Sequence, residues 1–377
     1  MRVVHVLHGL SPGQGGVLTA ALDLCAALGQ LGANVEILLT SDASQDVAAE
    51  NGTYPVRRFP LDRWGRLRDA SPAQQHAYQQ YLAAADVVHL HTPWSGRNMA
   101  IASRLRKLGK PYGVSIHGML DRWSLRQKAV KKKLFLHCFA ARFLHRAAFI
   151  HCTAAAETKQ VLEVLPRLAS TVVTLPCVFD AGPYLPIGKT ERPAGEPRIL
   201  FLSRLHPKKG CETLIAAAHI LQQRGHKFRL VIAGPGTPSY VASLKTRVEQ
   251  AGLQGITEFT GMVLGDEKLQ LYRQADIFAL PTQQENFGIV LVEAMAAALP
   301  VVTTKGTDIW SELEQGGARI VDATAASFAD SLEGLILDSS ERLRAGRQGA
   351  AHVARWLDTH RTAEGYLDVY RRSVAQA

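Results

Sequence analysis

The chain lacks long apolar runs and has few cysteines. No apolar stretch approaches the roughly 20 residues that a membrane-spanning helix needs. The first residues, MRVVHVLHGLSPGQGG, contain one basic residue and a very short apolar run, which favours a first strand over a signal peptide. We therefore expect a cytoplasmic protein. The cysteines show no CxxC pair and no His–Cys cluster at metal-ligand spacing, so we expect reduced, mostly buried side chains. They are Cys25, Cys138, Cys152, Cys177 and Cys211.

Acidic residues are also scarce relative to basic ones. The sequence has 43 Lys and Arg against 33 Asp and Glu, a net charge of +10. This surplus favours an anionic partner, such as a nucleotide, a phospholipid or a nucleic acid, without choosing among them. No D-x-D triplet occurs, so a metal-bridged diphosphate site of that kind is not supported, and we expect neither a metal nor a resident cofactor.

What the chain does contain is an alternation of apolar strands and helical segments, repeated twice. Its 377 residues, 47% of them hydrophobic, suffice for two domains with separate cores. The pattern predicts an α/β fold of two Rossmann-like, doubly wound parallel-sheet domains that face each other across a cleft. We place the N-terminal domain at residues 1–180, a Pro- and Gly-rich linker at 181–197, and the C-terminal domain at 198–357. In such sheets, ligands bind beyond the carboxyl ends of the strands.

The most informative stretch is PTQQENFGIVLVEAMAAALP, residues 281–300. We expect Glu285 in a loop after a buried strand and Glu293 inside a helix over 290–298. The two could be ordinary surface carboxylates. However, the helix around Glu293 is apolar, so this carboxylate needs a partner, and a ligand hydroxyl is one candidate. Free backbone N–H groups between the glutamates would bind anions and hydroxyls; they belong to Phe287, Gly288 and Ile289.

A second motif, SRLHPKKG, follows the first strand of the second half. Arg204 and Lys209 flank a turn ahead of a helix, and two cations there suit a pyrophosphate or a departing nucleoside diphosphate. We interpret Lys208 as a solvated charge. Two further loops, AGPG at 233–236 and TGMV at 260–263, end with Gly236 and Val263; either could approach a base or ribose, and each signal is weak alone.

The N-terminal half offers two candidates. Gly15 and Gly16, in SPGQGGV, allow a tight turn and close approach to a phosphate, although a purely structural turn remains open and the dinucleotide fingerprint fails at Leu18. His117, in SIHGML, ends a strand and would project into the cleft; the alternative is a satisfied core histidine. His89 and His91 we interpret as structural.

A basic helical stretch over residues 125–146 combines cations with apolar residues. It could lie on an anionic membrane surface or receive a phosphorylated lipid acceptor. Packing of its aromatic residues on the sheet is an equal alternative. The cations of this segment are Arg126, Lys128, Lys131, Lys132, Lys133, Arg142 and Arg146.

Together these motifs closely resemble those of the family 4 glycosyltransferases, which are retaining enzymes of the GT-B architecture. The resemblance rests on Glu285-x7-Glu293 within ENFGIVLVE, on Arg204 and Lys209, on the Gly15–Gly16 loop and on His117, in family order. The E-x7-E set is fairly specific, whereas the glycine loop alone is not.

The resemblance implies a role for each matched position. Glu293 would hold the ribose hydroxyls of a nucleotide, and Glu285 with the amides of Phe287, Gly288 and Ile289 would hold the sugar hydroxyls. Arg204 and Lys209 would bind the diphosphate, the Gly15–Gly16 loop would approach it, and His117 would contact the sugar near the anomeric carbon. At position 286 the family also has small or other polar residues, so Asn286 would influence which sugar hydroxyls are bound.

The family also implies retention by front-face attack, in which the leaving phosphate takes the acceptor proton, and a last helix, residues 358–377, that packs back on the N-terminal domain. We therefore expect a hexosyltransferase that uses a UDP- or GDP-hexose and a saccharide or lipid-linked saccharide acceptor, in cell-surface polysaccharide or glycolipid synthesis. Rival enzymes are a GT-B nucleotide-sugar epimerase and a phosphorylase. A basic nucleic-acid- or membrane-binding protein would use the charge and leave ENFGIVLVE unexplained, so we expect no nucleic-acid partner.

Overall fold

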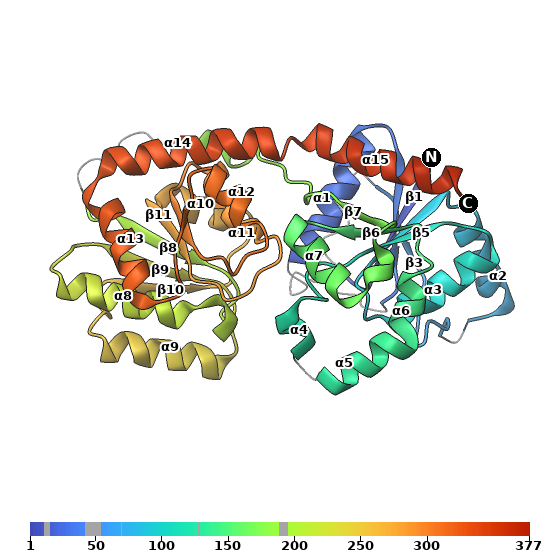
Figure 1. Cartoon of the computed structure of the whole chain (residues 1–377), viewed down its shortest axis with the longest axis horizontal. Helices are drawn as coiled ribbons and strands as arrows, with labels where there is room; N and C mark the ends of the chain where they lie inside the picture. Colours follow the sequence, from blue (N-terminus) through green and yellow to red (C-terminus); the bar gives the residue numbers. More distant parts are fainter. Residues whose placement is uncertain (11–15, 42–53, 69, 127–128, 188–194) are drawn as a thin grey trace. The chain divides into compact units, whose positions relative to one another are not determined.

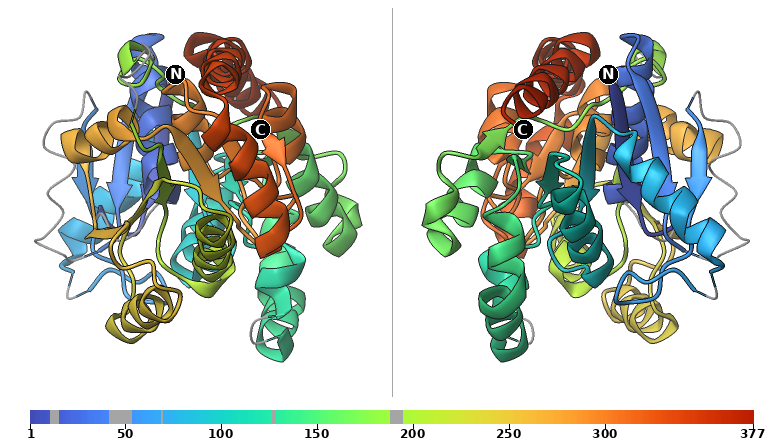
Figure 2. Two further views of the ribbon diagram at one scale, coloured as in Figure 1. Left: turned by 90° about the vertical axis from the view of Figure 1, so that its left-hand side faces the viewer. Right: turned by 90° about the vertical axis from the view of Figure 1, so that its right-hand side faces the viewer.

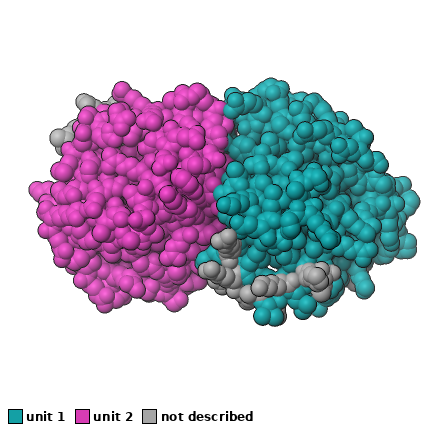
Figure 3. All heavy atoms as spheres, in the orientation of Figure 1, with its two compact units in different colours: residues 1–179, 357–377 teal, residues 180–356 magenta. Residues whose placement is uncertain are grey.

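The structure, a computed structural model, describes residues 1–10, 16–41, 54–68, 70–126, 129–187 and 195–377. The chain divides into two compact units, residues 1–179 with 357–377 and residues 180–356 (Figure 3). The described part of the expected linker belongs to the second unit, because Tyr184 and Ile187 are buried there and the Tyr184 ring contacts Tyr272. The last helix, α15 (Thr359–Ala375), belongs to the first unit.

The first unit is built on a parallel sheet of seven described strands in the order β3-β2-β1-β4-β5-β6-β7 (Figure 1). The strand order reverses at the β1–β4 pair, as in doubly wound sheets. The strands are β1 Arg2–Leu7, β2 Asn34–Leu39, β3 Val56–Arg58, β4 Val87–His91, β5 Tyr112–Ser115, β6 Phe149–Cys152 and β7 Val172–Thr174.

Helices cover both faces of this sheet. Strand side chains alternate between the faces, so Val4 and Val6 of β1 join one apolar cluster with α2, α3, α6 and α7, while Val3 and Leu7 join the other with α1 and α15. Burial on both faces explains the continuous apolar strands of the sequence. The helices are α1 Gly16–Gln30, α2 Pro72–Ala83, α3 Gly96–Lys107, α4 Arg122–Arg126, α5 Ala129–Phe135, α6 Ala141–Leu144 and α7 Ala155–Val164, with a 3₁₀ turn at Pro166–Leu168.

The segment expected to be helical, residues 125–146, is helical over most of its described length. Helix α5, a π-helical turn at Leu136–Ala140 and α6 follow one another without a break. The wider turn changes the helical phase, and Leu136, Phe143 and Leu144 become buried against the sheet. No helix within the described residues is long and apolar enough to cross a bilayer.

The second unit repeats the same winding with six described parallel strands, in the order β10-β9-β8-β11-β12-β13. The order reverses at the β8–β11 pair, and helices flank both faces (Figures 1 and 2). The strands are β8 Arg198–Leu202, β9 Arg229–Ala233, β10 Thr257–Gly261, β11 Ile277–Leu280, β12 Val301–Thr303 and β13 Arg319–Ile320. The helices are α8 Cys211–Gln223, α9 Pro238–Gln250, α10 Gly265–Gln274, α11 Ile289–Ala296, α12 Trp310–Gln315, α13 Ala325–Leu337 and α14 Ser339–Trp356, with 3₁₀ turns at Leu185–Ile187 and Pro207–Lys209.

Candidate functional site

Two of the sequence motifs meet where the strand order of the second sheet reverses. SRLHPKKG follows β8 and ENFGIVLVE follows β11, and these two strands are hydrogen-bonded neighbours. Loops at the carboxyl ends of such a pair diverge to opposite faces, which leaves room between them for a ligand. The strand order therefore brings together motifs that lie about 80 residues apart in the sequence.

The turn after β8 is fastened to the start of the loop after β11. The Lys208 carbonyl oxygen accepts hydrogen bonds from the Gln283 N–H at 2.7 Å and from the Thr282 hydroxyl at 3.3 Å. Gly210 has φ 71°, and a Cβ there would lie 2.0 Å from the Pro281 carbonyl oxygen. Glycine at this position therefore permits both the left-handed turn and the close approach of the two loops.

This attachment places Lys209 against Glu285. The two side chains form an ion pair, with 6% of the Lys209 side chain and 22% of the Glu285 side chain exposed. Burial and the neighbouring Lys208 and Arg204 cations lower the pKa of Lys209 to about 7. The Glu285 carboxylate acts in the opposite direction, so we take the ammonium form to be present at neutral pH. Arg204 is exposed and stays outside this ion pair.

The Glu285 loop is held by the segment that follows β12. The Glu285 N–H donates to the Gly306 carbonyl oxygen at 2.7 Å, and the Asp308 N–H donates to the Glu285 carbonyl oxygen at 3.0 Å. The Asn286 amide donates to the Asp308 carboxylate at 3.2 Å. Asn286 is thus occupied in fixing the loop, in addition to the sugar-reading role expected of it.

Helix α11 begins at Ile289, directly after Gly288 in a left-handed conformation with φ 63°. The N–H groups of Phe287, Gly288 and Ile289 make no hydrogen bond to any described residue. Phe287 itself is buried and its ring stacks on Trp356 of α14. The helix start thus presents free donors beside Glu285, as the sequence motif predicts.

Glu293 is buried, with 3% of its surface exposed, and it has two protein partners. Tyr272 donates its hydroxyl to Oε2 at 2.8 Å, and Lys268 donates to Oε1 at 2.7 Å. Neither glutamate has an obvious partner in the sequence, yet the fold provides them: α10 supplies two partners for Glu293, and Lys209 pairs with Glu285. A carboxylate has about four acceptor positions, so Glu293 retains capacity for a ligand hydroxyl.

Val263 lies in the short segment between β10 and α10, the helix that carries Lys268 and Tyr272. Its neighbours Met262 and Leu264 are 46% and 54% exposed, and Val263 is partly exposed. This segment is tied to the loop after β9, because the Gly234 N–H donates to the Gly261 carbonyl oxygen at 2.7 Å. The two weak loop motifs of the sequence are therefore adjacent.

His117 belongs to the first unit and lies just beyond β5, with φ 53°. Its Nε2 lies 2.9 Å from Nδ1 of His91, and the ring is partly exposed. Burial lowers the pKa of His117 to about 3, so the imidazole is neutral at physiological pH. The next residue is held by Glu157 of α7, whose carboxylate accepts the Gly118 N–H at 2.5 Å.

The glycine loop is only partly described. Gly16 is the first residue of α1 and is exposed, and no atom lies within 4 Å of the position that a Cβ would occupy there. Gly15 lies outside the described residues. The structure therefore brings together Lys209, Glu285, Asn286 and the start of α11, places Glu293 one turn farther along that helix, and holds His117 and Gly16 in the other unit.

Comparisons with known proteins find relatives for both halves of the chain. A family model described as glycosyl transferase 4-like domain matches residues 15–177, and one described as glycosyl transferases group 1 matches residues 187–352. Both models describe glycosyl transferases and together span most of the chain, which is consistent with the family 4 resemblance. Its fold is GT-B: it matches crystal structures of HepE from Anabaena, with TM-score 0.80 and 19% identity over 99% of this chain and 100% of that one, and sucrose-phosphate synthase from Thermosynechococcus elongatus, with TM-score 0.79 and 18% identity over 100% of both.

Curated proteins similar to this chain include D-inositol 3-phosphate glycosyltransferases. The Nocardia farcinica protein is 30% identical over 58% of this chain and 51% of its own length. The Arthrobacter sp. protein is 26% identical over 96% of this chain and 91% of its own length. The chain thus spans about half the length of the first relative and nearly all of the second.

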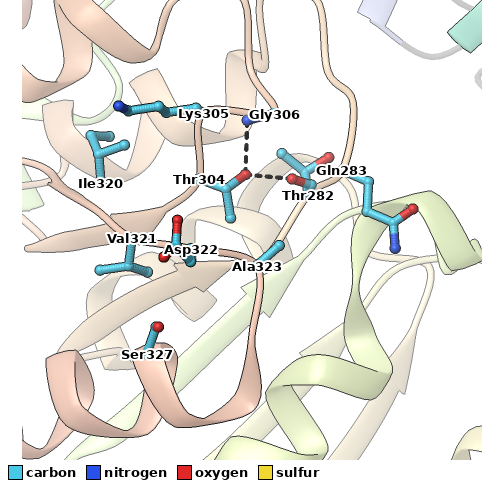
Figure 4. A pocket seen from close by; sticks show the side chains of 10 residues that line it. All are labelled: Thr282, Gln283, Thr304, Lys305, Gly306, Ile320, Val321, Asp322, Ala323 and Ser327. Atoms are coloured by element: carbon cyan, nitrogen blue, oxygen red, sulfur yellow. Dashed lines mark hydrogen bonds between the residues drawn. The ribbon is translucent and has the colours of Figure 1, made fainter.

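A hollow of about 600 Å³ lies beyond the carboxyl ends of β11, β12 and β13 (Figure 4). In it, the Thr304 hydroxyl donates to the Thr282 carbonyl oxygen and accepts the Gly306 N–H at 3.0 Å. These bonds join the segments after β11 and β12 that also frame Glu285. The lining residues are Thr282, Gln283, Thr304, Lys305, Gly306, Ile320, Val321, Asp322, Ala323 and Ser327.

The basic segment over residues 125–146 has exposed apolar side chains. Val130, Leu134 and Phe139 are 83%, 63% and 60% exposed. Lys132 is engaged within the protein, because it donates to the Ser124 carbonyl oxygen at 2.6 Å and lies over the Trp94 ring. Arg142 and Arg146 are exposed, and the side chains of the other four cations are not described.

Sequence reasoning missed Lys268 and Tyr272, which hold Glu293 in the second unit, and Glu157, which holds the backbone after His117 in the first unit. Lys268 and Tyr272 lie four residues apart on α10, so they share one helix face, and the apolar helix around Glu293 indicated that some partner was needed. Glu157 is 1% exposed on α7. Its contact with the Gly118 N–H is set by the tertiary fold, whereas its contact with Thr153, four residues earlier, is local and was overlooked in the sequence.

Proposed function

We propose that this protein is a retaining hexosyltransferase that moves a hexosyl unit from a UDP- or GDP-hexose to a saccharide or lipid-linked saccharide acceptor. The observation that carries the proposal is the arrangement at the ends of β8 and β11, where Lys209, Glu285 and free N–H groups of α11 adjoin. Cations and N–H donors suit a diphosphate, and paired carboxylates suit the hydroxyls of ribose and sugar.

In the proposed site, Lys209 and Arg204 neutralise the diphosphate, Glu293 accepts the ribose hydroxyls and the exposed Met262–Leu264 segment contacts the base. Glu285, with the N–H groups of Phe287, Gly288 and Ile289, binds the hexose hydroxyls. Lys209 pairs with Glu285, and a bound diphosphate would compete for the ammonium and release Glu285 toward the sugar. The Gly15–Gly16 loop and His117 are proposed to reach the donor from the first unit.

For the chemical step we propose front-face attack. The bond between the anomeric carbon and the diphosphate oxygen breaks, the acceptor oxygen bonds to that carbon on the same face, and the departing phosphate oxygen takes the acceptor proton. Protein cations stabilise the charge that develops on the leaving group, and the proposal requires neither a metal nor a resident cofactor. Glu285 then supports the transition state and does not act as a nucleophile.

Two features bear on the donor and acceptor. HepE was crystallised with UDP and glucose, which supports starting with UDP-sugars. The relatives named D-inositol 3-phosphate glycosyltransferases support including an inositol phosphate among the acceptors tested. We also propose a cytoplasmic enzyme that contacts anionic membranes through Val130, Leu134 and Phe139 with nearby cations, and serves cell-surface polysaccharide or glycolipid synthesis.

A thermal-shift screen against UDP-, GDP- and ADP-hexoses tests the proposal, because a ligand that binds the folded state raises the midpoint. The donor with the largest shift is then incubated with each acceptor class, and NMR reads the anomeric configuration of the product. We expect transfer with retention. Conversion of the sugar with donor alone would indicate an epimerase, a requirement for inorganic phosphate would indicate a phosphorylase, and no response to any nucleotide sugar would refute the site.

A further inference from the structure

A chain of hydrogen-bonded side chains crosses the core of the first unit from His117 to the Leu175 carbonyl group. We call it the histidine relay. Its members other than His117 are at most 4% exposed and come from β1, β4, β5, β6 and α15. The successive links are His117 Nε2–His91 Nδ1 at 2.9 Å, His91 Nε2–His5 Nδ1 at 3.1 Å, His5 Nε2–Tyr370 Oη at 3.5 Å, Tyr370 Oη–His89 Nδ1 at 2.8 Å, His89 Nε2–Ser115 Oγ at 2.7 Å, Ser115 Oγ–His151 Nδ1 at 2.7 Å and His151 Nε2–Leu175 O at 2.9 Å.

The Leu175 end fixes the direction of these bonds. A carbonyl oxygen only accepts, so Nε2 of His151 must carry the hydrogen. A neutral imidazole has one donor and one acceptor nitrogen, so Nδ1 of His151 accepts from the Ser115 hydroxyl. The Tyr366 hydroxyl also lies 2.8 Å from this Nε2. Its own hydrogen goes to the Pro176 carbonyl oxygen at 3.1 Å, so it does not need Nε2 as an acceptor, and Nε2 can carry a hydrogen.

Each further link then has one solution. Ser115 has used its hydrogen, so it accepts from Nε2 of His89, whose Nδ1 accepts from the Tyr370 hydroxyl. Tyr370 can then only accept from Nε2 of His5, and Nδ1 of His5 accepts from His91. The logic requires neutral rings, and burial lowers the pKa of His5 to about 3 and that of His151 to about 4.

We propose that the histidine relay holds His117 as the tautomer protonated at Nε2, so that its Nδ1 presents a lone pair and accepts a hydrogen bond from a bound hydroxyl. His91, His5, Tyr370, His89, Ser115 and His151 are positioning residues in this scheme. Nδ1 of His117 makes no hydrogen bond to any described residue, and the ring is partly exposed. It is therefore the open end of the relay.

A metal ion is the competing interpretation. Ligand atoms of His5, His89 and His91 lie within 4.8 Å of one another, and imidazole is a common zinc ligand. However, both nitrogens of each of these rings already have a partner in the relay, at 2.7 to 3.5 Å. Ligation would take lone pairs that these bonds use, so the two interpretations exclude each other.

The consequence for recognition rests on the proposed function. If His117 faces the donor sugar, an acceptor-only Nδ1 requires a hydroxyl that donates at the position it contacts. A fluorine at that position cannot donate and would face a lone pair, so the site would discriminate against it. The Leu175 carbonyl group sets the direction of every hydrogen bond in the relay. The relay would therefore make the site select a hydroxyl that donates at this position of the sugar.

Long-range ¹H–¹⁵N NMR of protein labelled with ¹⁵N-histidine tests the relay without any substrate, since it identifies the protonated nitrogen of each neutral ring. His117 should be protonated at Nε2 in the wild type and in His91→Asn, whose amide oxygen can accept in place of Nδ1. In His91→Phe, or in Tyr370→Phe if the former fails to fold, both tautomers should appear. Protonation of His117 at Nδ1 in the wild type, an unchanged pure tautomer in both cut variants, or a stoichiometric metal that resists chelation would overturn the proposal.

Monofluorinated UDP-glucose analogues test the consequence. We expect one position at which fluorine weakens binding by about three- to tenfold in the wild type, as loss of one hydrogen bond predicts. That penalty should shrink in His91→Phe, where His117 can also donate, and persist in His91→Asn. An equal penalty in both variants would refute the acceptor role even if the NMR result held. Absence of any UDP-glucose binding would instead count against the proposed function and leave the NMR test of the relay intact.

Discussion

At the scale of single residues, the two glutamates of the E-x7-E motif differ in their surroundings. Glu285 is partly exposed and pairs with one buried lysine, whereas Glu293 is buried and shared by a tyrosine and a partly exposed lysine. The first arrangement can be opened by a ligand that competes for the lysine. The Glu293 carboxylate is held in place, because Tyr272 is itself fully buried and donates its hydroxyl to Glu293 at 2.8 Å.

Replacing Tyr272 by Phe should therefore lower the free energy of unfolding by about 1–3 kcal/mol, because it leaves one oxygen of a buried carboxylate without its donor. Tyr78→Phe is the matched control: Tyr78 is similarly buried, and its hydroxyl makes no hydrogen bond to any described residue. We expect the control to be neutral or slightly stabilising. Urea titrations measure both, and equal effects of the two substitutions would contradict the role given to Tyr272.

At the scale of elements, the site depends on how closely two loops approach. Gly210 is the point of contact between the turn after β8 and the strand end of β11, and Gly288 starts α11 in a left-handed conformation. The position of Lys209 is therefore set by how the loops after β8 and β11 pack together. The chemistry of the site therefore depends on backbone packing as much as on the charged side chains.

Gly210→Ala should destabilise the second unit by roughly 3 kcal/mol or more, since the new Cβ combines a left-handed backbone with a clash at the Pro281 carbonyl oxygen. Gly225→Ala is the control, because Gly225 has φ 83° and no atom within 4 Å of the Cβ position. It should cost only about 1–2 kcal/mol of backbone strain. Urea unfolding distinguishes the two, and a similar loss in both variants would show that the loop contact is unimportant.

The elements also show what the sequence could predict. Buried strands such as β1 and β11 were recognised because parallel strands covered on both faces are apolar throughout. The helical character of segment 125–146 was recognised, but its π-helical turn was not, since such a turn leaves the composition helical while changing the helical phase. The partners of Glu285 and Glu293 were missed because Lys209 is 76 positions and Lys268 is 25 positions away in the sequence, and only the sheet order makes them neighbours.

At the scale of the whole molecule, the two units share one winding order and differ in what their cores contain. The sheet of the first unit buries His5, His89, His91 and His151, whereas the described strands of the second unit contain no histidine. Burial holds the pKa of each of these histidines, and of His117, below the usual 6.5. The first unit should consequently be the more sensitive to acid.

The direction of this pH dependence of stability follows from proton uptake. As the pH falls below about 6.5, the unfolded chain binds protons that the folded histidines, with lower pKa values, do not bind, so stability is lost on acidification. Each histidine contributes up to about 1.4 kcal/mol per pH unit. Urea titrations from pH 7.5 to 5, read by hydrogen exchange in β1 and β4, should show this loss. Strands β8 and β11 serve as the internal control, and equal pH dependence in both units would contradict the role given to the buried histidines.

We propose that the carboxyl ends of β8 and β11 bind the diphosphate of a nucleotide sugar, and calorimetry of Lys209→Ala tests this binding most directly. The titrant is the nucleotide hexose that gives the largest thermal shift, and Lys208→Ala, next along the same turn, is the control. Loss of a charge-assisted contact predicts a rise in Kd of about 10- to 100-fold for Lys209→Ala, and less than about threefold for Lys208→Ala. Wild-type affinity in Lys209→Ala would contradict the claim.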